Sequence, residues 1–173
     1  MDRNLKIYDY CVMKLDSPLD LTTEWLKAGN LTDSHTPPDK SVNWVYFKLA
    51  SPGVLEDELH TGYTTTYGDE VCRDVYPNLN EPSNLCTDDS NFDDFCAALP
   101  GSGLFYFMEA THFQVGLTSF NEGCQDYTPK PSVYAYLPKM TKWIFASTQE
   151  DSRARLLNAQ AQREQSKSTK NKS

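Results

Sequence analysis

A chain of 173 residues has room for one domain with a hydrophobic core, or for an incomplete copy of a larger one. Hydrophobic residues make up 39% and charged residues 23%, as in globular proteins, and the net charge of −8 argues against nucleic acid as a partner. No apolar run approaches the roughly 20 residues that a membrane-spanning helix needs, so no membrane span is expected.

The first half of the chain predicts strands separated by turn-rich segments. Lys6 to Leu15 alternates well enough for a strand, and Leu21 to Thr32 is expected to be a connection. A turn-rich loop follows from Ser34 to Ser41. The sequence SVNWVYFKLA then predicts a strand, and a further strand is expected within Val54 to Thr66.

The second half predicts more strands and then a helix. Leu104 to Leu117 is expected to be a strand that is interrupted near Glu109 to His112 by a hairpin turn, and Val133 to Leu137 is another strand. Pro138 to Ser147 predicts a terminal helix. Residues 149–173 carry six Lys/Arg and three Asp/Glu, and we expect a basic tail, helical and then disordered, beyond a domain of residues 1–148.

The cysteines are odd in number and show no CxxC spacing. With only three histidines in the chain, this pattern predicts neither a zinc site nor another metal site, and no cofactor is expected. The five cysteines are Cys11, Cys72, Cys86, Cys96 and Cys124.

Three blocks in the second half carry the most specific motif. They are DDFCAALPGSGLF from Asp93, QVGLTSFNEGC from Gln114 and PKPSVYAYLPKMTKWI from Pro129. In this order and near these spacings, they resemble the C-terminal half of a trypsin-like (chymotrypsin-fold) serine protease. The resemblance implies an all-β fold with one complete six-stranded antiparallel barrel, which is the second of the family's two, a remnant of the first barrel, and a C-terminal helix.

The position of the family's nucleophile differs from the family pattern. Aligned without gaps on Cys96, the nucleophilic serine corresponds to Pro100, which has neither a hydroxyl to activate nor a backbone N–H. Of the two oxyanion-hole donors of the family, only the N–H of Ala98 would be left. Leu99 stands where the family has the aspartate that pairs with the freed N-terminus after zymogen cleavage, so that ion pair is not expected.

The resemblance also assigns the triad aspartate, in the block KIYDYCVMKLDSPL. Asp9 matches that residue, but no histidine precedes it, and the three histidines that follow it are expected to be surface residues. They are His35, His60 and His112. The alternative is an active peptidase whose nucleophile is Ser102 and whose histidine lies in upstream sequence. Against it, Ser102 lies in GSG, a pattern typical of a turn serine.

A substrate pocket is implied by the same blocks. Asp94, two residues before Cys96, matches the base of a pocket that favours Arg or Lys side chains. The alternative is that Asp94 is an exposed acid in a loop. Ser132 replaces a glycine of the pocket and is expected to narrow it. The residues that match the wall pairing with substrate backbone are Ser119, Phe120 and Asn121.

Disulfides and compartment follow from the resemblance as well. It pairs Cys72 with Cys86 and Cys96 with Cys124, and leaves Cys11 as a small buried residue of the first predicted strand. Two disulfides imply an extracellular protein, in which Asn30 of NLT is a glycosylation acceptor. The N-terminus carries no signal peptide, so we expect that an upstream portion is absent from this sequence.

These observations predict a catalytically inactive serine-protease homologue that acts, if at all, through protein binding. Its expected partner is therefore a protein or a peptide, and its oligomeric state is left open. The trypsin-like endopeptidase with Ser102 as nucleophile is the alternative, and a truncated product without function is a third interpretation.

Overall fold

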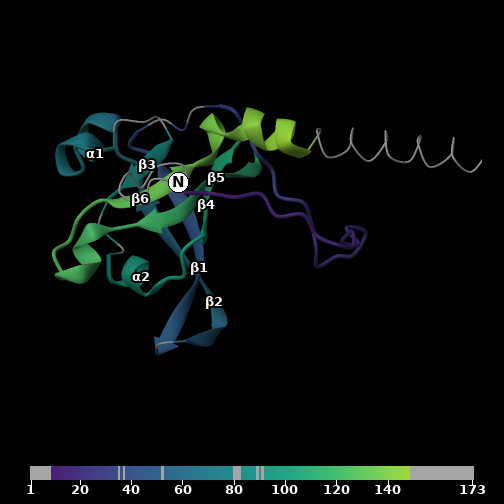
Figure 1. The fold of residues 1–173 in the computed structure, drawn as a ribbon, viewed down its shortest axis with the longest axis horizontal. Coiled ribbons are helices and arrows are strands. Elements are labelled where there is room, and N and C mark those ends of the chain that lie inside the picture. The colour runs from purple at the N-terminus through teal and green to yellow at the C-terminus, as the bar shows by residue number, and fades with distance from the viewer. Residues whose placement is uncertain are drawn as a thin grey trace, which may run out of the picture. The chain divides into compact units, whose positions relative to one another are not determined.

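The computed structural model describes residues 9–148, except 35, 37, 52, 80–82, 89 and 91. It is built around a six-stranded antiparallel sheet (Figure 1). The strands are β1 (Ser41–Ser51), β2 (Val54–Thr65), β3 (Asn84–Thr87), β4 (Gly103–Met108), β5 (Thr111–Phe120) and β6 (Ser132–Tyr136). The helices are α1 (Asp69–Val75) and α2 (Phe92–Ala97), with 3-10 turns η1 (Glu122–Gln125) and η2 (Leu137–Lys139). Within these residues, no helix is long and apolar enough to span a bilayer.

The sheet closes into a barrel. Its order is β2-β1-β4-β5-β6-β3, and the two end strands meet where Thr66 bridges Thr87. Beside this bridge, the Tyr67 N–H donates to the Cys86 carbonyl at 2.9 Å, and the Asp88 N–H donates to the Thr65 carbonyl at the same distance. A closed sheet satisfies the backbone groups that an edge strand would leave open. The predicted six-stranded barrel is therefore confirmed.

The barrel interior is filled by alternate residues of β1. In a strand, every second side chain points to the same face, and Val42, Trp44 and Tyr46 are all buried. The rings of Trp44 and Tyr46 stack with centroids 3.8 Å apart, and the Trp44 indole N–H donates to the Thr118 hydroxyl at 3.1 Å. The hydrogen bond matters because an unpaired indole N–H in the core would be costly. The other buried members of this cluster are Leu85, Phe95, Ala98, Leu104, Val115, Tyr134 and Tyr136.

The predicted hairpin between the fourth and fifth strands is confirmed. The strand expected over Leu104 to Leu117 divides into β4 and β5, and the turn that joins them consists of Glu109 and Ala110. Both turn residues have positive φ, 49° and 62°. This is the mirror-image turn whose twist matches that of the flanking strands, although its positions usually carry Asn or Gly.

Both disulfides implied by the resemblance are present. Cys72–Cys86 joins α1 to β3, and Cys96–Cys124 joins α2 to η1. They connect helices outside the barrel to its strands or to the loop that follows β5. Their loops span 14 and 28 residues, so they constrain the unfolded chain in two different places.

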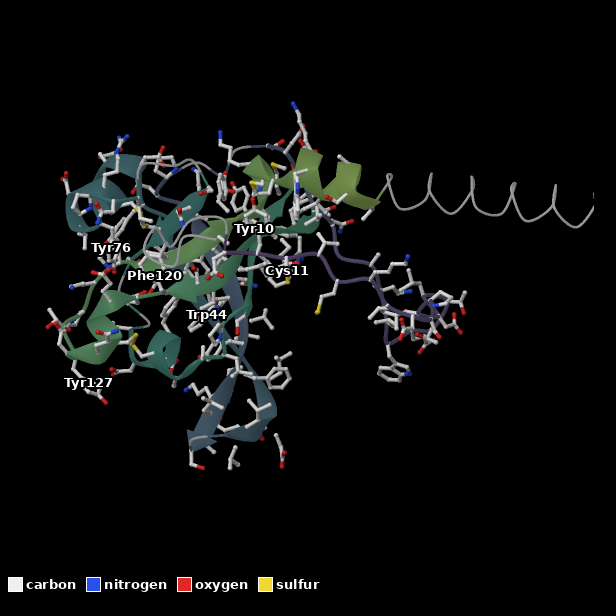
Figure 2. All side chains as sticks on the ribbon, viewed as in Figure 1. Tyr10, Cys11, Trp44, Tyr76, Phe120 and Tyr127 are labelled. Carbon is white, nitrogen blue, oxygen red and sulfur yellow. A yellow bond between two sulfur atoms is a disulfide. The ribbon has the colours of Figure 1, made fainter. Side chains whose placement is uncertain are left out.

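The first predicted strand is wrong over its described part. Residues 9–15 form no strand and are exposed except for Tyr10, whose hydroxyl donates to the Met140 sulfur at 3.0 Å. A strand needs a neighbouring strand to satisfy its backbone, and none of the barrel strands pairs with this segment. Cys11 is accordingly an exposed free thiol, and its expected burial is also wrong (Figure 2).

A C-terminal helix is present, as predicted. It belongs to a second compact unit, residues 141–173, of which 141–148 are described and helical. The α-helix begins three residues later than expected, because Leu137–Lys139 form the 3-10 turn η2, in which the Met140 N–H donates to the Leu137 carbonyl at 2.8 Å. The predicted basic tail, 149–173, lies outside the described residues.

Candidate functional site

The loop at the nucleophile position is a tight turn with proline at its corner. Leu99, Pro100, Gly101 and Ser102 form it, and the Ser102 N–H donates to the Leu99 carbonyl at 3.3 Å. Gly101 has φ +86°, which an L side chain rarely adopts. Proline followed by a glycine of positive φ is the pattern of a type II turn, because proline sets the first central φ near −65°. Pro100, which the sequence predicts to stand at the family's nucleophile position, therefore has a structural role in this turn.

Ser102 uses all its polar atoms within the fold. Its hydroxyl donates to the Leu99 carbonyl at 2.6 Å. Its own carbonyl accepts from the Thr118 N–H at 2.8 Å and from the Thr118 hydroxyl at 3.2 Å. The side chain thus closes the turn and the main chain pairs with β5, as a turn serine would.

Every backbone N–H from Ala98 to Ser102 has a carbonyl partner in the protein. The Ala98 N–H donates to Phe95 at 3.2 Å, the Leu99 N–H to Phe47 at 3.0 Å and the Gly101 N–H to Thr118 at 2.8 Å. Pro100 has no N–H. An oxyanion hole needs N–H groups aimed at the developing charge, and in this loop the donors point at the protein itself.

At the end of β5, two residues of the predicted pocket wall point in different directions. The pairing with β6 skips one residue between Thr118 and Phe120, so Ser119 lies in a bulge. Its hydroxyl donates to the Asp9 carboxylate at 2.7 Å. Phe120 packs edge-on against Tyr76 with ring centroids 5.5 Å apart (Figure 2). The fold thus brings the residue matched to the triad aspartate to the predicted wall.

Asn121, directly after β5, and Ser132, the first residue of β6, are buried and hydrogen-bond to each other. They are 7% and 3% exposed. The Asn121 amide donates to the Lys130 carbonyl at 2.7 Å and to the Ser132 hydroxyl at 3.4 Å, and its side-chain oxygen accepts from the Gly123 N–H at 2.8 Å. A ligand that entered here would have to break these hydrogen bonds before it could displace the two side chains.

Asp94, matched to the pocket base, is already bound to a cation of its own chain. Its carboxylate lies 2.6 Å from the Lys48 ammonium and accepts from the Tyr46 hydroxyl at 2.8 Å. Burial raises the pKa of Asp94, but the hydrogen bonds from Lys48 and Tyr46 outweigh it and hold the pKa below its usual value. The charge that would attract a basic substrate side chain is thus largely balanced by Lys48.

Lys48 and Tyr46 were not among the predicted site residues, although a sequence signal for them existed. In the predicted strand SVNWVYFKLA, alternation places both on the same face as Trp44. Their nearness to Asp94 could not be inferred, because it depends on α2 lying against β1, as the bridge between Lys48 and Ala98 shows.

The described histidines lie on β2 and β5 and have local partners. His60 contacts the Glu56 carboxylate at 2.5 Å and stacks on Tyr46 with centroids 5.5 Å apart. His112 lies beside Phe107, with centroids 4.8 Å apart. His35 lies outside the described residues. These contacts are those of structural histidines.

Asn30, the predicted glycosylation acceptor, is exposed beside β5. Its carbonyl accepts from the Gln114 N–H at 2.9 Å, and its amide donates to the His112 carbonyl at 3.3 Å. Among the residues that the structure describes, no group of three His, Cys, Asp or Glu side chains could hold a metal ion.

A comparison with protein families agrees with this architecture. The family model described as Trypsin matches residues 2–144, which is most of the chain. The match spans the exposed N-terminal segment, the closed barrel, both disulfides and the turn at Pro100. The chain therefore belongs to the trypsin-like serine protease family.

Proposed function

We propose that this chain is a catalytically inactive serine-protease homologue. The observation that carries the proposal is the turn from Ala98 to Ser102, in which proline takes the nucleophile position and each backbone N–H donates to a protein carbonyl. Loss of a single oxyanion-hole donor typically costs about 2.7–4 kcal/mol of transition-state stabilisation. Here the donors and the nucleophile are missing together.

The alternative, a trypsin-like peptidase with Ser102 as nucleophile, requires the turn to open. The Ser102 hydroxyl would have to leave the Leu99 carbonyl and find a base. It would also need the Ala98 N–H to turn away from Phe95 toward a substrate oxygen. The turn geometry favours the inactive homologue.

A role in protein binding is supported by the long β1–β2 hairpin. Its far end projects beyond the rest of the sheet (Figure 1). Leu49 lies opposite Leu55 and Phe47 opposite Leu59 across the two strands, and all four are 40–55% exposed. An apolar stripe of this kind, bordered by acids at residues 56–58, fits a partner segment with apolar and basic side chains. We expect this role in an oxidising, extracellular compartment, and the two disulfides support that expectation.

Labelling with a fluorophosphonate probe tests inactivity. The purified protein should neither react with the probe nor hydrolyse arginyl or aromatic ester substrates. Ser102→Ala is the matched variant, because it removes the one serine hydroxyl next to the nucleophile position. Probe labelling of the wild type that disappears in Ser102→Ala would establish the peptidase alternative.

A further inference from the structure

Strand β2 is an end strand of the sheet, and it meets the other end strand only at its own C-terminal end. The bridge between Thr66 and Thr87, and the bond from the Asp88 N–H to the Thr65 carbonyl, close the barrel there. Along residues 54–62, no group that the structure describes hydrogen-bonds to the backbone on the outer edge of β2. This part of β2 belongs to the β1–β2 hairpin, which projects beyond the rest of the sheet (Figure 1). The barrel thus closes at one end of β2 and leaves an open strand edge at the other.

The pairing of β1 with β2 shows which backbone groups point out from this edge. In antiparallel strands, residues whose N–H and C=O bond to the neighbouring strand alternate with residues whose groups point away from it. The Phe47 carbonyl accepts from the Leu99 N–H at 3.0 Å, so the Phe47 backbone points away from β2, and that of its partner Leu59 points away from β1. Thr65 points toward β3 in the same way, and alternation along β2 gives Thr61 this direction too. Leu59 and Thr61, which are both exposed, therefore each present an N–H and a carbonyl at the open edge.

The side chains along this edge are apolar on the outer face of the sheet and acidic toward the tip of the hairpin. Leu59 is 55% exposed and lies opposite Phe47. Asp57 and Glu58 are exposed, and neither makes an ion pair with a residue that the structure describes, whereas Glu56 contacts a histidine of β2. Charged residues on an edge strand commonly prevent pairing between copies of one protein. Here three acids from each copy and a net charge of −8 oppose a second copy of this chain and favour a basic partner.

We propose that the open edge of β2 binds an extended, basic segment of a protein partner as an additional β-strand. The backbone of this segment pairs with the outward groups of Leu59 and Thr61, and one of its apolar side chains packs beside Leu59. Its lysine or arginine side chains pair with Asp57 and Glu58.

This binding mode deepens the protein-binding role proposed for the β1–β2 hairpin and rests on it. The apolar stripe alone would also accept the apolar face of a helix, which has no free backbone groups to offer. Main-chain pairing at β2 requires a partner that is extended. The two can therefore be told apart by whether the backbone of β2 takes part in binding.

Amide hydrogen exchange of the ¹⁵N-labelled protein tests the pairing. In the free protein, the amides of Leu59 and Thr61 should exchange rapidly. Saturation with the peptide acetyl-Lys-Lys-Val-Thr-Val-Thr-amide should slow their exchange at least tenfold and leave that of Leu15, in the exposed N-terminal segment, unchanged. Protection of Leu59 and Thr61 in the free protein that rises with protein concentration would instead identify a second copy as the occupant and overturn the proposal.

N-methylated peptides separate backbone pairing from side-chain contacts. When the valines lie on the same face as Leu59, their N–H groups point toward β2 and those of the threonines point away. N-methylation of both valines should thus weaken binding at least tenfold, and N-methylation of both threonines is the matched control. Equal binding by the two, or binding without protection of Leu59 and Thr61, would overturn the edge pairing and leave the apolar stripe of the proposed function as the contact. No binding by the unmodified peptide would also overturn the proposal.

Two sets of variants test the edge and the charge. Thr61→Pro removes an outward N–H without removing a bond to β1, so it should weaken peptide binding about tenfold, whereas Thr61→Val keeps the N–H and should bind as the wild type does. Asp57→Asn/Glu58→Gln should weaken binding about tenfold and reduce its dependence on salt. Its matched control is Asp16→Asn/Glu24→Gln, which changes two exposed acids outside the hairpin. Equal binding by these two double variants would show that the segment is not selected for basic residues. If Thr61→Pro does not fold, the methylated peptides still decide whether the edge pairs.

Discussion

At the scale of single residues, Pro100 has a conformational role in a turn, at the position that we propose corresponds to the family's nucleophile. Proline lacks the hydroxyl and the N–H that acyl transfer needs. It also presets the φ angle of the turn that Gly101 completes with φ +86°. Reversion to serine therefore restores a hydroxyl but removes a conformational constraint.

Pro100→Ser should lower the free energy of unfolding by about 0.4–1 kcal/mol, because the unfolded chain gains freedom that the folded turn does not use. The measurement is chemical denaturation, accompanied by fluorophosphonate labelling, which should stay absent. Pro18→Ser in the exposed N-terminal segment is the control and should change stability less. Turnover by Pro100→Ser would show that a competent base and oxyanion hole are present after all.

The Asp94 cluster predicts a pH dependence of stability. Because the folded pKa of Asp94 is lowered, its contribution is fully present above the unfolded pKa of about 3.9 and is lost as the pH falls through the folded pKa. Asp94→Asn should thus cost up to about 1 kcal/mol at pH 7, as partly exposed ion pairs do, and progressively less below pH 4.

Urea denaturation of wild type and Asp94→Asn between pH 7 and pH 2.5 measures this difference. Asp93→Asn, an exposed neighbour on the same helix, is the matched control and should show a smaller difference at pH 7. A difference between wild type and Asp94→Asn that stays constant down to pH 2.5 would contradict the role of Lys48 and Tyr46.

At the scale of elements, the β4–β5 hairpin has a turn that its residues do not favour. A left-handed conformation costs an L residue roughly 1–2 kcal/mol, and glycine avoids most of this cost. Ala110, with φ 62°, is exposed at that turn. Register and pairing of the two strands stabilise the turn despite its local preference.

Ala110→Gly should therefore stabilise the protein by about 0.5–1 kcal/mol, once the greater entropy of glycine in the unfolded chain is subtracted. Thermal unfolding measures the change. Ala135→Gly in β6 is the contrasting variant and should destabilise, because that residue is buried in an ordinary strand. Destabilisation by Ala110→Gly would show that the turn is not left-handed.

The strand predictions were correct where the pairing strand follows directly in the chain. SVNWVYFKLA alternates, and β1 pairs with β2 directly after it in the chain. Residues 9–15 alternate too, but no barrel strand offers them an edge. Periodicity indicates which face a strand would bury, whereas the existence of the strand depends on a neighbour.

At the scale of the whole molecule, the disulfides stabilise by restricting the unfolded chain. The chain-entropy relation gives roughly 3 kcal/mol for the 14-residue separation of Cys72 and Cys86, and roughly 3.6 kcal/mol for the 28-residue separation of Cys96 and Cys124. The Cys96–Cys124 disulfide, which closes the longer loop, should therefore contribute more to the free energy of unfolding.

Double alanine variants of each pair, compared by calorimetry, test this order. The variant lacking Cys96–Cys124 should be less stable than the variant lacking Cys72–Cys86 by about 0.6 kcal/mol. Cys11→Ala is the control and should be close to wild type, since Cys11 is exposed and free. The opposite order would mean that native packing around the bridges outweighs loop entropy.

The sequence named candidate site residues but not their contacts. Pro100, Asp94 and the wall residues were proposed because three blocks keep the family's spacing along the chain, and their roles stay predictions. The cysteine pairing that came from the same resemblance is confirmed. Tyr46 and Lys48 were missed because they contact Asp94 across 46 or more residues of sequence.

The sequence by itself determined the family and the barrel with its C-terminal helix, because motifs and alternation are local properties of a chain. Only the tertiary structure decided that the N–H groups beside Pro100 bond to protein carbonyls, that Lys48 balances Asp94 and that Cys11 is exposed. The physical reason is that hydrogen-bond partners and burial are set by which distant segments meet when the sheet closes.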